Sequence, residues 1–541
     1  MRWKQLSHGD KNSMTAYRKG PSESALRTYH VGPPPFDDTA ENETSPCPPP
    51  LIGFEIEVGQ YLLDSMGKDS PRRGAEALTR AHHRLSGCDR KNPENQANEF
   101  DSDGFRCYPD HEHFELSGPL VASAVNFVLA QRKARKKLAR CKDEAEKSVG
   151  PMRVHFDNTN RHGTAWGFHI NALISRHVFQ RWAEKDWRVM HGQYLPFLAA
   201  SPVLWGAGKL GAEKGGAPAL FQLSQRSDFM DRIVGLETVH SKSLINVRDE
   251  PLASPRRYAR FHIIAFDTNR AEFASFLKAG VTQLVLALLS EWHRLPDLAL
   301  TDPLRAMATI SRDLSLSVPL RKVNGGETTA LEIQYRLAEC CGDAIDDGSA
   351  VAEVPDAKTI LDLWIRTLDD LAQRRPRIVR RLDWRARLEL LRRAGHSRRD
   401  ERALEAADLA YGELGGLFDS LEASGAMECL EDFLPGRSWS PASFNQREAV
   451  RARLLSLFDG AVVTADWNRV VIQSPRGVRW DFRLDDPSAC GRLLDLVQRS
   501  GSRGDCLQRL SRTGFAEALS LASEVPTIVA GTQPWEDPIN A

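Results

Sequence analysis

The chain has 541 residues, 41% of them apolar, which is enough for one large domain and a smaller one. Its 72 lysines and arginines balance 72 acidic residues, so the net charge gives no reason to expect binding to nucleic acid or to a membrane surface. Nine scattered cysteines without a CxxC pair, no apolar N-terminal leader and no long uninterrupted apolar stretch predict a cytoplasmic protein with reduced thiols and no membrane span.

The composition changes twice along the chain. Residues 1–50 hold eight of the 30 prolines and few aliphatic side chains, which predicts a disordered extension. Residues 51–407 begin with short alternating segments and continue into long helical stretches, which predicts a large α+β domain. Residues 408–541 alternate helical and strand-like segments, and we expect a small α/β domain with a weakly structured tail.

A basic segment, 131–147, continues an apolar helical stretch. Its lysines and arginines are spread around the helix, which favours a solvated helix face over a docking surface for an acidic partner.

The first strand-like segment places two carboxylates side by side. In Gly53–Val58 every second residue is apolar, so Glu55 and Glu57 point together to the other face of the strand. Adjacent carboxylates repel each other unless a cation neutralises them. This spacing therefore makes Glu55 and Glu57 candidate metal ligands.

Further segments carry the same kind of side chain on one face. They combine carboxylates with imidazole, amide and guanidinium groups, which phosphoryl transfer uses to hold Mg²⁺ and phosphate oxygens. No P-loop or GxGxxG motif is present, so the sheet itself would hold a nucleotide. The residues concerned are Asp110 and Glu115 in Tyr108–Glu115, His169 and Asn171 in Phe168–Ala172, Arg226 in Phe221–Arg226, Asn246 and Arg248 in Leu244–Glu250, and Arg260 and His262 in Arg260–Ile264.

Each segment alone has an ordinary structural explanation. A Glu-x-Glu pair usually lies on a solvated face, and a lone histidine is usually a hydrogen-bonded, partly buried one. The repetition over several strands favours a functional site, because a merely solvated face would also carry lysine and threonine.

In their order along the chain, these segments resemble the ligase and the deamidase of the prokaryotic ubiquitin-like protein Pup, relatives of glutamine synthetase and glutamate–cysteine ligase. The resemblance covers about residues 51–480. It rests on these motifs: Gly53-Phe54-Glu55-Ile56-Glu57, Tyr108-Pro109-Asp110-His111, Phe221–Asp228, Val234–Thr238, Ile245–Pro251, Arg257–His262, Leu382-Asp383-Trp384 and Asp408–Tyr411. It implies a glutamine-synthetase-like large domain whose curved, mostly antiparallel sheet forms a cradle packed by helices.

The resemblance also implies cofactors, partners and roles. ATP and Mg²⁺ would serve to activate the side chain of the C-terminal glutamate of a small Pup-like tag, which is then joined to lysines of protein substrates. Glu55, Glu57 and Glu115 are similar to the Mg²⁺ ligands. His169, Asn171, Arg226, Arg248 and His262 would contact nucleotide or metal, and Asp110 matches the catalytic aspartate. Asp110 would deprotonate the lysine in a ligase, and in a deamidase it would act on the amide as a nucleophile or through water.

The direction of the reaction stays open. Phe221–Thr238 is more similar to the deamidase, whereas the short distance between Glu57 and Asp110 and the segment Asp302–Ala306 are more similar to the ligase.

Three positions depart from the usual family pattern. Leu120 and Ile170 replace glutamates, and Leu252 replaces a histidine. Loss of acids near a cation site would weaken Mg²⁺ binding or reshape the tag-binding groove. Two alternatives therefore remain: an ATP-dependent ligase or phosphotransferase that acts on a small molecule, and a non-catalytic regulatory protein that keeps the fold.

Overall fold

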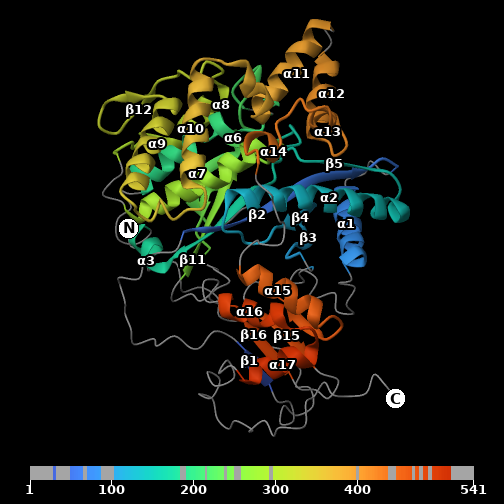
Figure 1. The fold of residues 1–541 in the computed structure, drawn as a ribbon. Coiled ribbons are helices and arrows are strands. Elements are labelled where there is room, and N and C mark those ends of the chain that lie inside the picture. The colour runs from blue at the N-terminus through green and yellow to red at the C-terminus, as the bar shows by residue number, and fades with distance from the viewer. Residues whose placement is uncertain are drawn as a thin grey trace, which may run out of the picture.

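The computed structural model describes residues 28–31, 49–64, 70–86, 101, 103–182, 190–213, 216–236, 241–248, 258–291, 296–397, 401–436, 446–465, 469–473, 479–484 and 490–512. Figure 1 shows two groups of elements. The large group contains the main sheet and most of the helices, and the small group, mostly coloured red, is built from the last elements of the chain together with β1 (Thr28–Val31).

The main sheet of the described chain has eight strands in the order β3-β4-β2-β6-β11-β10-β9, with β5 paired to the far part of β2. Neighbouring strands are antiparallel, except for the parallel pair β9 and β10. This confirms the predicted α+β fold with a mostly antiparallel sheet. The strands are β2 (Leu51–Leu62), β3 (Arg106–Asp110), β4 (His113–Ser117), β5 (Met152–His155), β6 (Phe168–Ser175), β9 (Met230–Gly235), β10 (Lys242–Asn246) and β11 (Tyr258–Phe266).

The strand β2 shows why the sheet has one apolar and one polar face. Phe54, Ile56 and Val58 are buried in the core, as the alternation of side chains along a strand requires. The ring of Phe54 meets the ring of Phe127 on the covering helix edge to face, at 5.2 Å between centroids. Glu55 and Glu57 consequently point to the opposite face.

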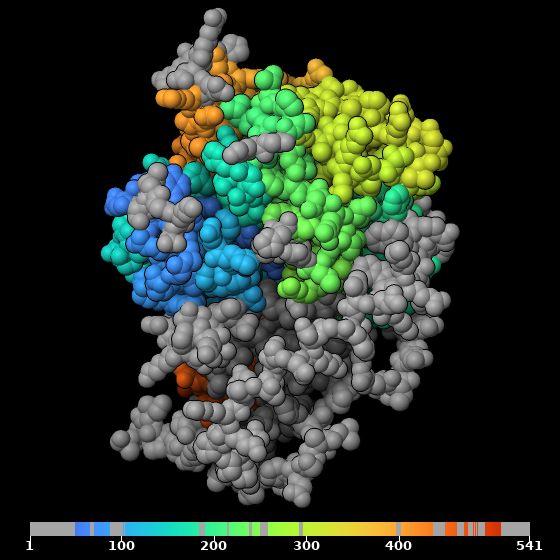
Figure 2. All heavy atoms as spheres, turned by 180° about the vertical axis from the view of Figure 1, so that it is seen from behind, coloured from blue at the N-terminus to red at the C-terminus, as the bar shows by residue number. Residues whose placement is uncertain are grey.

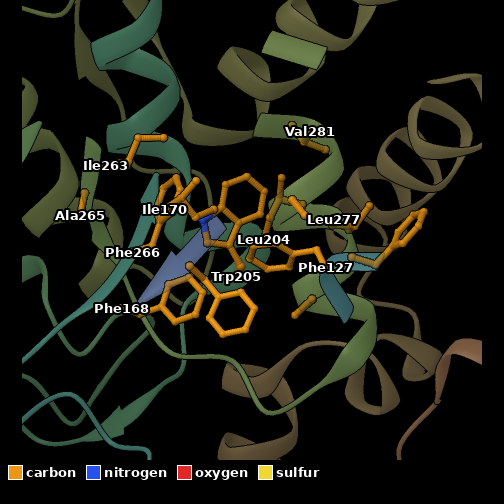
Figure 3. Close-up of a cluster of buried hydrophobic side chains, with 14 of the residues drawn as sticks. Phe127, Phe168, Ile170, Leu204, Trp205, Ile263, Ala265, Phe266, Leu277 and Val281 are labelled. Carbon is orange, nitrogen blue, oxygen red and sulfur yellow. The ribbon is translucent and has the colours of Figure 1, made fainter. Parts of the chain in front are cut away.

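Three helices cover the apolar side: α1 (Ser70–Ser86), α2 (Ala124–Val149) and α7 (Glu272–Ser290). By length and composition α7 could cross a membrane, but 94% of its apolar window is buried inside the protein. Figure 3 shows Leu277 and Val281 of α7 in one cluster with Phe168, Ile170 and Trp205. This burial makes α7 the central core helix.

The other helices of the large group pack around α7 and beyond the sheet. Seen from behind in Figure 2, the yellow region of α9 and α10 lies on the opposite side of the body from α1, in blue. Helix α9 begins with a capping box, in which the side chains of Thr329 and Glu332 each accept a hydrogen bond from the other residue's backbone N–H. These helices are α3 (Arg176–Gln180), α5 (Leu195–Ala200), α6 (Pro202–Trp205), α8 (Pro303–Arg312), α9 (Ala330–Asp346), α10 (Ala357–Ala372), α11 (Asp383–Ser397), α12 (Glu401–Gly412), α13 (Leu417–Ala423) and α14 (Leu430–Phe433).

Several basic side chains of α2 tie this helix to other parts of the chain. The ion pairs are partly buried and join residues far apart in the sequence. They link Arg132 to Glu272, Lys133 to Asp103, Arg135 to Glu422 and Lys137 to Asp101. For these four residues, the predicted solvated face is therefore replaced by internal ion pairs, because acidic residues of the neighbouring loops and helices face them.

The small group is an α/β unit, as predicted. Its sheet has the order β1-β16-β15-β14, and three helices of the described residues share one core with it. Its core includes Val450, Phe458, Ile472, Phe482 and Val497, and it is separate from the core of the large group. The elements are α15 (Gln446–Leu457), β14 (Val462–Ala465), β15 (Arg469–Gln473), β16 (Arg479–Arg483), α16 (Cys490–Arg499) and α17 (Arg503–Arg512).

The expected domain boundary at 407/408 falls inside α12. A charge pair of 3.0 Å between Arg387 and Asp408 fastens α12 to α11, and Tyr411 and Leu434 still belong to the large core. The second core begins at Val450. We therefore propose a boundary between Leu434 and Gln446.

The expected disordered extension contains one strand, β1 (Thr28–Val31), which pairs in parallel with β16. The prediction was therefore wrong for these four residues. Tyr29 and Val31 are residue types that favour strands, and the edge of β16 offers backbone groups to pair with. Residues 1–27 and 32–48 lie outside the described residues.

Candidate functional site

Three carboxylates meet on the polar face of the sheet and are called here the carboxylate triad: Glu57, Asp110 and Glu115. Glu57 on β2 is directly opposite Glu115 on β4. Asp110 ends β3, the strand beside β4. One oxygen atom of each of the three lies within 4.8 Å of the others. The sequence predicted these three residues as site residues, and the structure brings them together.

The position of Asp110 follows from a tight turn. Strand β3 ends at Asp110 and β4 begins at His113, so only two residues connect them. His111 takes a left-handed conformation, with φ of 51°, which two-residue hairpin turns require. The side chain of Asp110 is 41% exposed. The catalytic candidate therefore stands at the rim of the site, within reach of an incoming group.

Crowding of negative charge perturbs the triad. Burial and the charges of Glu55 and Glu57 raise the pKa of Glu115 well above its usual range. Burial and the charge of Glu57 also raise the pKa of Asp110. Carboxylates whose negative charges repel one another are suited to hold a cation, because its positive charge would offset the repulsion. An all-oxygen set of this kind fits Mg²⁺.

A second cluster, the histidine cluster, adjoins the triad and consists of Glu55, His169 and His262. Glu55 is opposite His169 in the pairing of β2 with β6. Its Oε2 atom lies 2.9 Å from Nδ1 of His169 and 3.4 Å from Nε2 of His262. The three predicted metal ligands are therefore divided, since Glu55 stands with the histidines and Glu57 and Glu115 with Asp110.

The other oxygen of Glu55 is also engaged. Asn171 donates to Oε1 at 2.9 Å, and Arg260 donates to the same atom at 3.3 Å. Arg260 also donates from Nε to Asn171 at 2.6 Å. Asn171, predicted to bind cofactor, thus orients Glu55 in this structure. Arg260, which the sequence placed on the same face as His262, proves to be the charged partner of Glu55.

Electrostatics keep Glu55 ionised. Burial opposes the charge, but the hydrogen bond with His169, the close approach of His262 and the charge of Arg260 hold its pKa well below its usual range. Burial and the nearby Arg260 also lower the pKa of His262, to about 3, and a lowered pKa favours the neutral form of a histidine. The cluster therefore contains an ionised carboxylate beside a neutral imidazole, which is the form of histidine that binds metal.

Arg226 lies on a loop rather than on the sheet. It follows the short strand β8 (Phe221–Gln222), which pairs with β7 (Lys209–Leu210) and not with the main sheet. Its guanidinium is 2% exposed and donates from Nη1 to the carbonyl of Trp166 at 2.7 Å. Burial lowers its pKa, and the charges of Glu57 and Asp267 oppose that shift.

A glycine makes the close packing around Arg226 possible. A Cβ atom on Gly167 would lie 2.1 Å from Nε2 of His169 and 2.8 Å from Nη1 of Arg226. The N–H of Gly167 donates to Oε2 of Glu57 at 2.7 Å. Only a residue without a side chain fits between Arg226, the histidine cluster and the carboxylate triad.

Two residues of the site were missed as site residues in the sequence. Tyr108 donates from its hydroxyl to Oε1 of Glu115, and Ser117 donates to the same atom at 3.1 Å. Arg106 lies over the Tyr108 ring at 4.3 Å. The sequence held part of the information, since Tyr108 is two positions before Asp110 and therefore lies on the same face of the strand. The hydrogen-bond partner of its hydroxyl group, however, depends on the strand register.

Arg248 and its neighbour Asn246 are predicted residues that these contacts do not include, and Arg248 is the one to which a role was assigned. It follows the end of β10 and is exposed, and its backbone N–H donates to Oδ1 of Asn246 at 2.8 Å. Asp249 and Glu250, its motif neighbours, lie outside the described residues. Its role therefore stays a prediction.

The structure explains two of the three departures from the family pattern. Ile170 is fully buried on the apolar side, away from His169, so its exchange removes no acid from the polar face. Leu120 is buried in a small apolar cluster with Leu173 and Tyr258. The expected effect on a cation site therefore does not apply to Ile170. Leu252 lies outside the described residues.

Comparison with known proteins identifies the family. A model of the family described as Pup-ligase protein matches residues 56–471. The chain belongs to the Pup-ligase family. A depupylase from Acidothermus cellulolyticus is 32% identical over 78% of this chain and 82% of its own length. A Pup–protein ligase from Corynebacterium aurimucosum is 29% identical over 83% of this chain and 96% of its own.

Solved structures of the Pup-ligase family support the same conclusion. The Pup ligase PafA in complex with Pup has a TM-score of 0.68 and 25% identity, over 86% of this chain and 94% of that chain. PafA in complex with ADP has a TM-score of 0.62 and 25% identity, over 77% and 93%. Both ligases and depupylases of the family match this chain, so family membership does not decide the direction of the reaction.

Proposed function

We propose that this chain is an ATP-dependent enzyme that acts on the C-terminal Glu or Gln side chain of a small Pup-like protein tag, forming or removing an isopeptide bond to protein lysines. The observation that carries the proposal is the arrangement on one sheet face of the carboxylate triad, the histidine cluster and Arg226. This set provides cation ligands, a buried guanidinium and an accessible carboxylate, which together suit transfer at a carboxyl group. The relatives' names and the ADP-bound neighbour support it.

Glu57 and Glu115 would hold Mg²⁺ with Asp110 at the rim of the same site. Such a cation, when bound, offsets the negative charge of phosphate oxygens. His169 would stand between this site and Glu55, since its Nε2 atom is 3.8 Å from Oε1 of Glu57. Tyr108 and Ser117 would fix the orientation of Glu115 through their hydrogen bonds to Oε1.

The remaining groups would bind and orient the substrates. Arg226 would contact an anionic phosphate group, because it is a buried cation beside the triad whose Nε has no hydrogen-bond partner among the described residues. Arg260 and Asn171 would keep Glu55 in place. Asp110 would accept a proton from the attacking lysine in the ligase direction, or act on the amide or on a water molecule in the reverse direction.

The test is incubation of the purified protein with ATP, Mg²⁺, a Pup-like tag ending in glutamate and a lysine-bearing acceptor protein, followed by intact-mass analysis. A mass increase of the acceptor by one tag less one water indicates a ligase. Loss of the tag from a preformed conjugate indicates a depupylase. If neither occurs and ATP is consumed without any tag, the small-molecule alternative replaces this proposal.

We also propose that the protein acts in the cytoplasm. Six cysteines in the described part of the chain are free thiols, including the neighbours Cys340 and Cys341. Free thiols are typical of reducing compartments. Labelling of intact cells with a thiol reagent, followed by fractionation of the cells, would check the location.

A further inference from the structure

Asp267 is a buried aspartate just beyond the end of β11 and outside the triad and the histidine cluster. Its side chain is 2% exposed. A buried carboxylate is costly unless hydrogen bonds satisfy its oxygens. Asp267 meets this requirement through four donors from two other loops.

Each oxygen of Asp267 accepts two hydrogen bonds. Oδ1 accepts from the hydroxyl of Ser224 at 3.0 Å and from the backbone N–H of Arg226 at 3.1 Å. Oδ2 accepts from the backbone N–H of Ala207 at 2.8 Å and of Gln225 at 2.9 Å. The carboxylate thus joins the loop at Ala207 to the loop Ser224–Arg226.

The loop held in this way carries Arg226. Its guanidinium donates to the carbonyl of Trp166, and Gly167 leaves the space that the guanidinium occupies. The backbone N–H of Arg226 is one of the four donors to Asp267, so the carboxylate fixes the point from which the side chain starts. A shift of this loop would move Arg226 away from Glu57.

Asp267 is in turn bound to helix α7. Nζ of Lys278 donates to the backbone carbonyl of Asp267 at 2.5 Å and lies 3.8 Å from the centre of the Phe168 ring. Lys278 is fully buried. The chain of contacts therefore runs from the core helix through Asp267 to the loop of Arg226.

We propose that Asp267 is a positioning residue that holds the loop Ser224–Arg226 so that the guanidinium of Arg226 is presented to the phosphate groups of a bound nucleotide. The nucleotide part rests on the proposed function. Asp267 acts through Arg226 and does not itself contact the ligand. An asparagine would not serve as well, because in either orientation its amide nitrogen would face at least one backbone N–H donor, that of Arg226 or those of Ala207 and Gln225.

The first experiment measures amide hydrogen exchange in the full chain without any ligand. In Asp267→Asn the amide of Gln225 or that of Arg226 exchanges about tenfold faster or more, because each donates to a different oxygen of Asp267 and one of these oxygens becomes an NH2 group. The control is Asp101→Asn, since Asp101 is also 2% exposed and has three hydrogen bonds and an ion pair with Lys137, but at the loop before β3. Exchange at Gln225 and Arg226 that equals the parent, or that rises equally in the control, overturns the proposal.

The second experiment measures the Kd for ADP with Mg²⁺ in Asp267→Asn, in Arg226→Gln and in the double variant. We expect Asp267→Asn to weaken binding about tenfold, and to add less than about twofold once Arg226 is replaced. Additive effects would show that Asp267 does not act through Arg226. Failure of the parent chain to bind ADP would contradict the proposed function, while the exchange result would still decide the structural role.

A milder variant covers the case in which Asp267→Asn does not fold. Ser224→Ala removes one of the four bonds and should speed exchange at Arg226 to a smaller extent. An unchanged exchange rate in this variant, with a folded chain, counts against the proposal.

Discussion

The Nδ1 atom of His169 lies 2.9 Å from a carboxylate oxygen of Glu55. The other nitrogen of the same ring is 3.8 Å from Glu57, so one imidazole stands between the histidine cluster and the carboxylate triad. The two clusters form one continuous polar surface. A change of charge in the triad should therefore alter the electrostatics of both clusters.

We predict that Glu57→Gln raises the Mg²⁺ concentration needed for half-maximal ADP binding by about tenfold or more. The exchange removes one negative charge of the triad but keeps the side-chain volume and an oxygen for the N–H of Gly167. Titration of Mg²⁺ at fixed ADP measures the effect. Glu76→Gln on the exposed surface of α1 is the control, and an equal response of the two variants would refute the metal role of Glu57.

We predict that Asp110→Asn abolishes product formation and changes the Kd for ADP by less than about threefold. Asp110 is at the rim of the triad and is more exposed than Glu57, so its loss removes the proton acceptor or nucleophile while the buried ligands stay. Product is followed by mass spectrometry of the acceptor protein, and ADP binding by calorimetry. An active Asn variant would remove Asp110 from the mechanism, and Asp64→Asn, on the surface, should behave as the parent does.

The sequence predicted much of this site because alternation along a strand is a local property. Glu55 and Glu57 could be placed on one face from their spacing alone. Their opposite neighbours, Glu115 on β4 and His169 on β6, are also polar residues. The division of the acids into two clusters could not be predicted, since it depends on which residue of β6 pairs with which residue of β2. Register is fixed by long-range contacts and not by the segment itself.

The domain boundary shows a second limit of sequence analysis. Composition changes near Asp408, but the residue lies in the middle of α12, where it is fully buried and paired with Arg387. A charged pair within a core is not visible as hydrophobic periodicity. The same holds for Asp267, whose donors come from residues about 40 and 60 positions away along the chain.

We predict that Leu120→Glu, which restores the residue type usual in the family, lowers the melting temperature by at least about 3 °C. Leu120 is packed with Leu173 and Tyr258 and is 5% exposed, so a carboxylate would be buried among apolar groups. Differential scanning calorimetry measures the shift. Leu120→Met should stay close to the parent, and a Glu variant as stable as the parent would show that the cluster opens easily.

We predict that Lys278→Met stabilises the protein most at low pH. Burial lowers the pKa of Lys278 to about 7 from an ordinary value of 10.5, and Asp267 and Asp383 only partly oppose this shift. Between pH 7 and 10.5 the unfolded chain holds a proton that the folded chain has released, so the parent gains at most about 1.4 kcal/mol of stability for each pH unit in this range. The cost of Lys278 is therefore complete below pH 7 and disappears near pH 10.5.

The check for Lys278 is the difference in melting temperature between Lys278→Met and the parent, measured from pH 6 to pH 10. This difference should shrink steadily as the pH rises above about 7. Lys147→Met, at an exposed position, should show no such trend. A difference that does not depend on pH would contradict the lowered pKa.

In the proposed function, the polar sheet face acts on a protein tag with the help of ATP and Mg²⁺. The measurement follows ADP and ammonia release together, in the presence of a lysine-bearing acceptor protein, with a Pup-like tag ending in glutamate, the same tag ending in glutamine, and no tag. We predict that at least one product forms only when both Mg²⁺ and a tag are present, and that Asp110→Asn removes it. Release at the same rate without any tag, or no release with either tag, would contradict the claim.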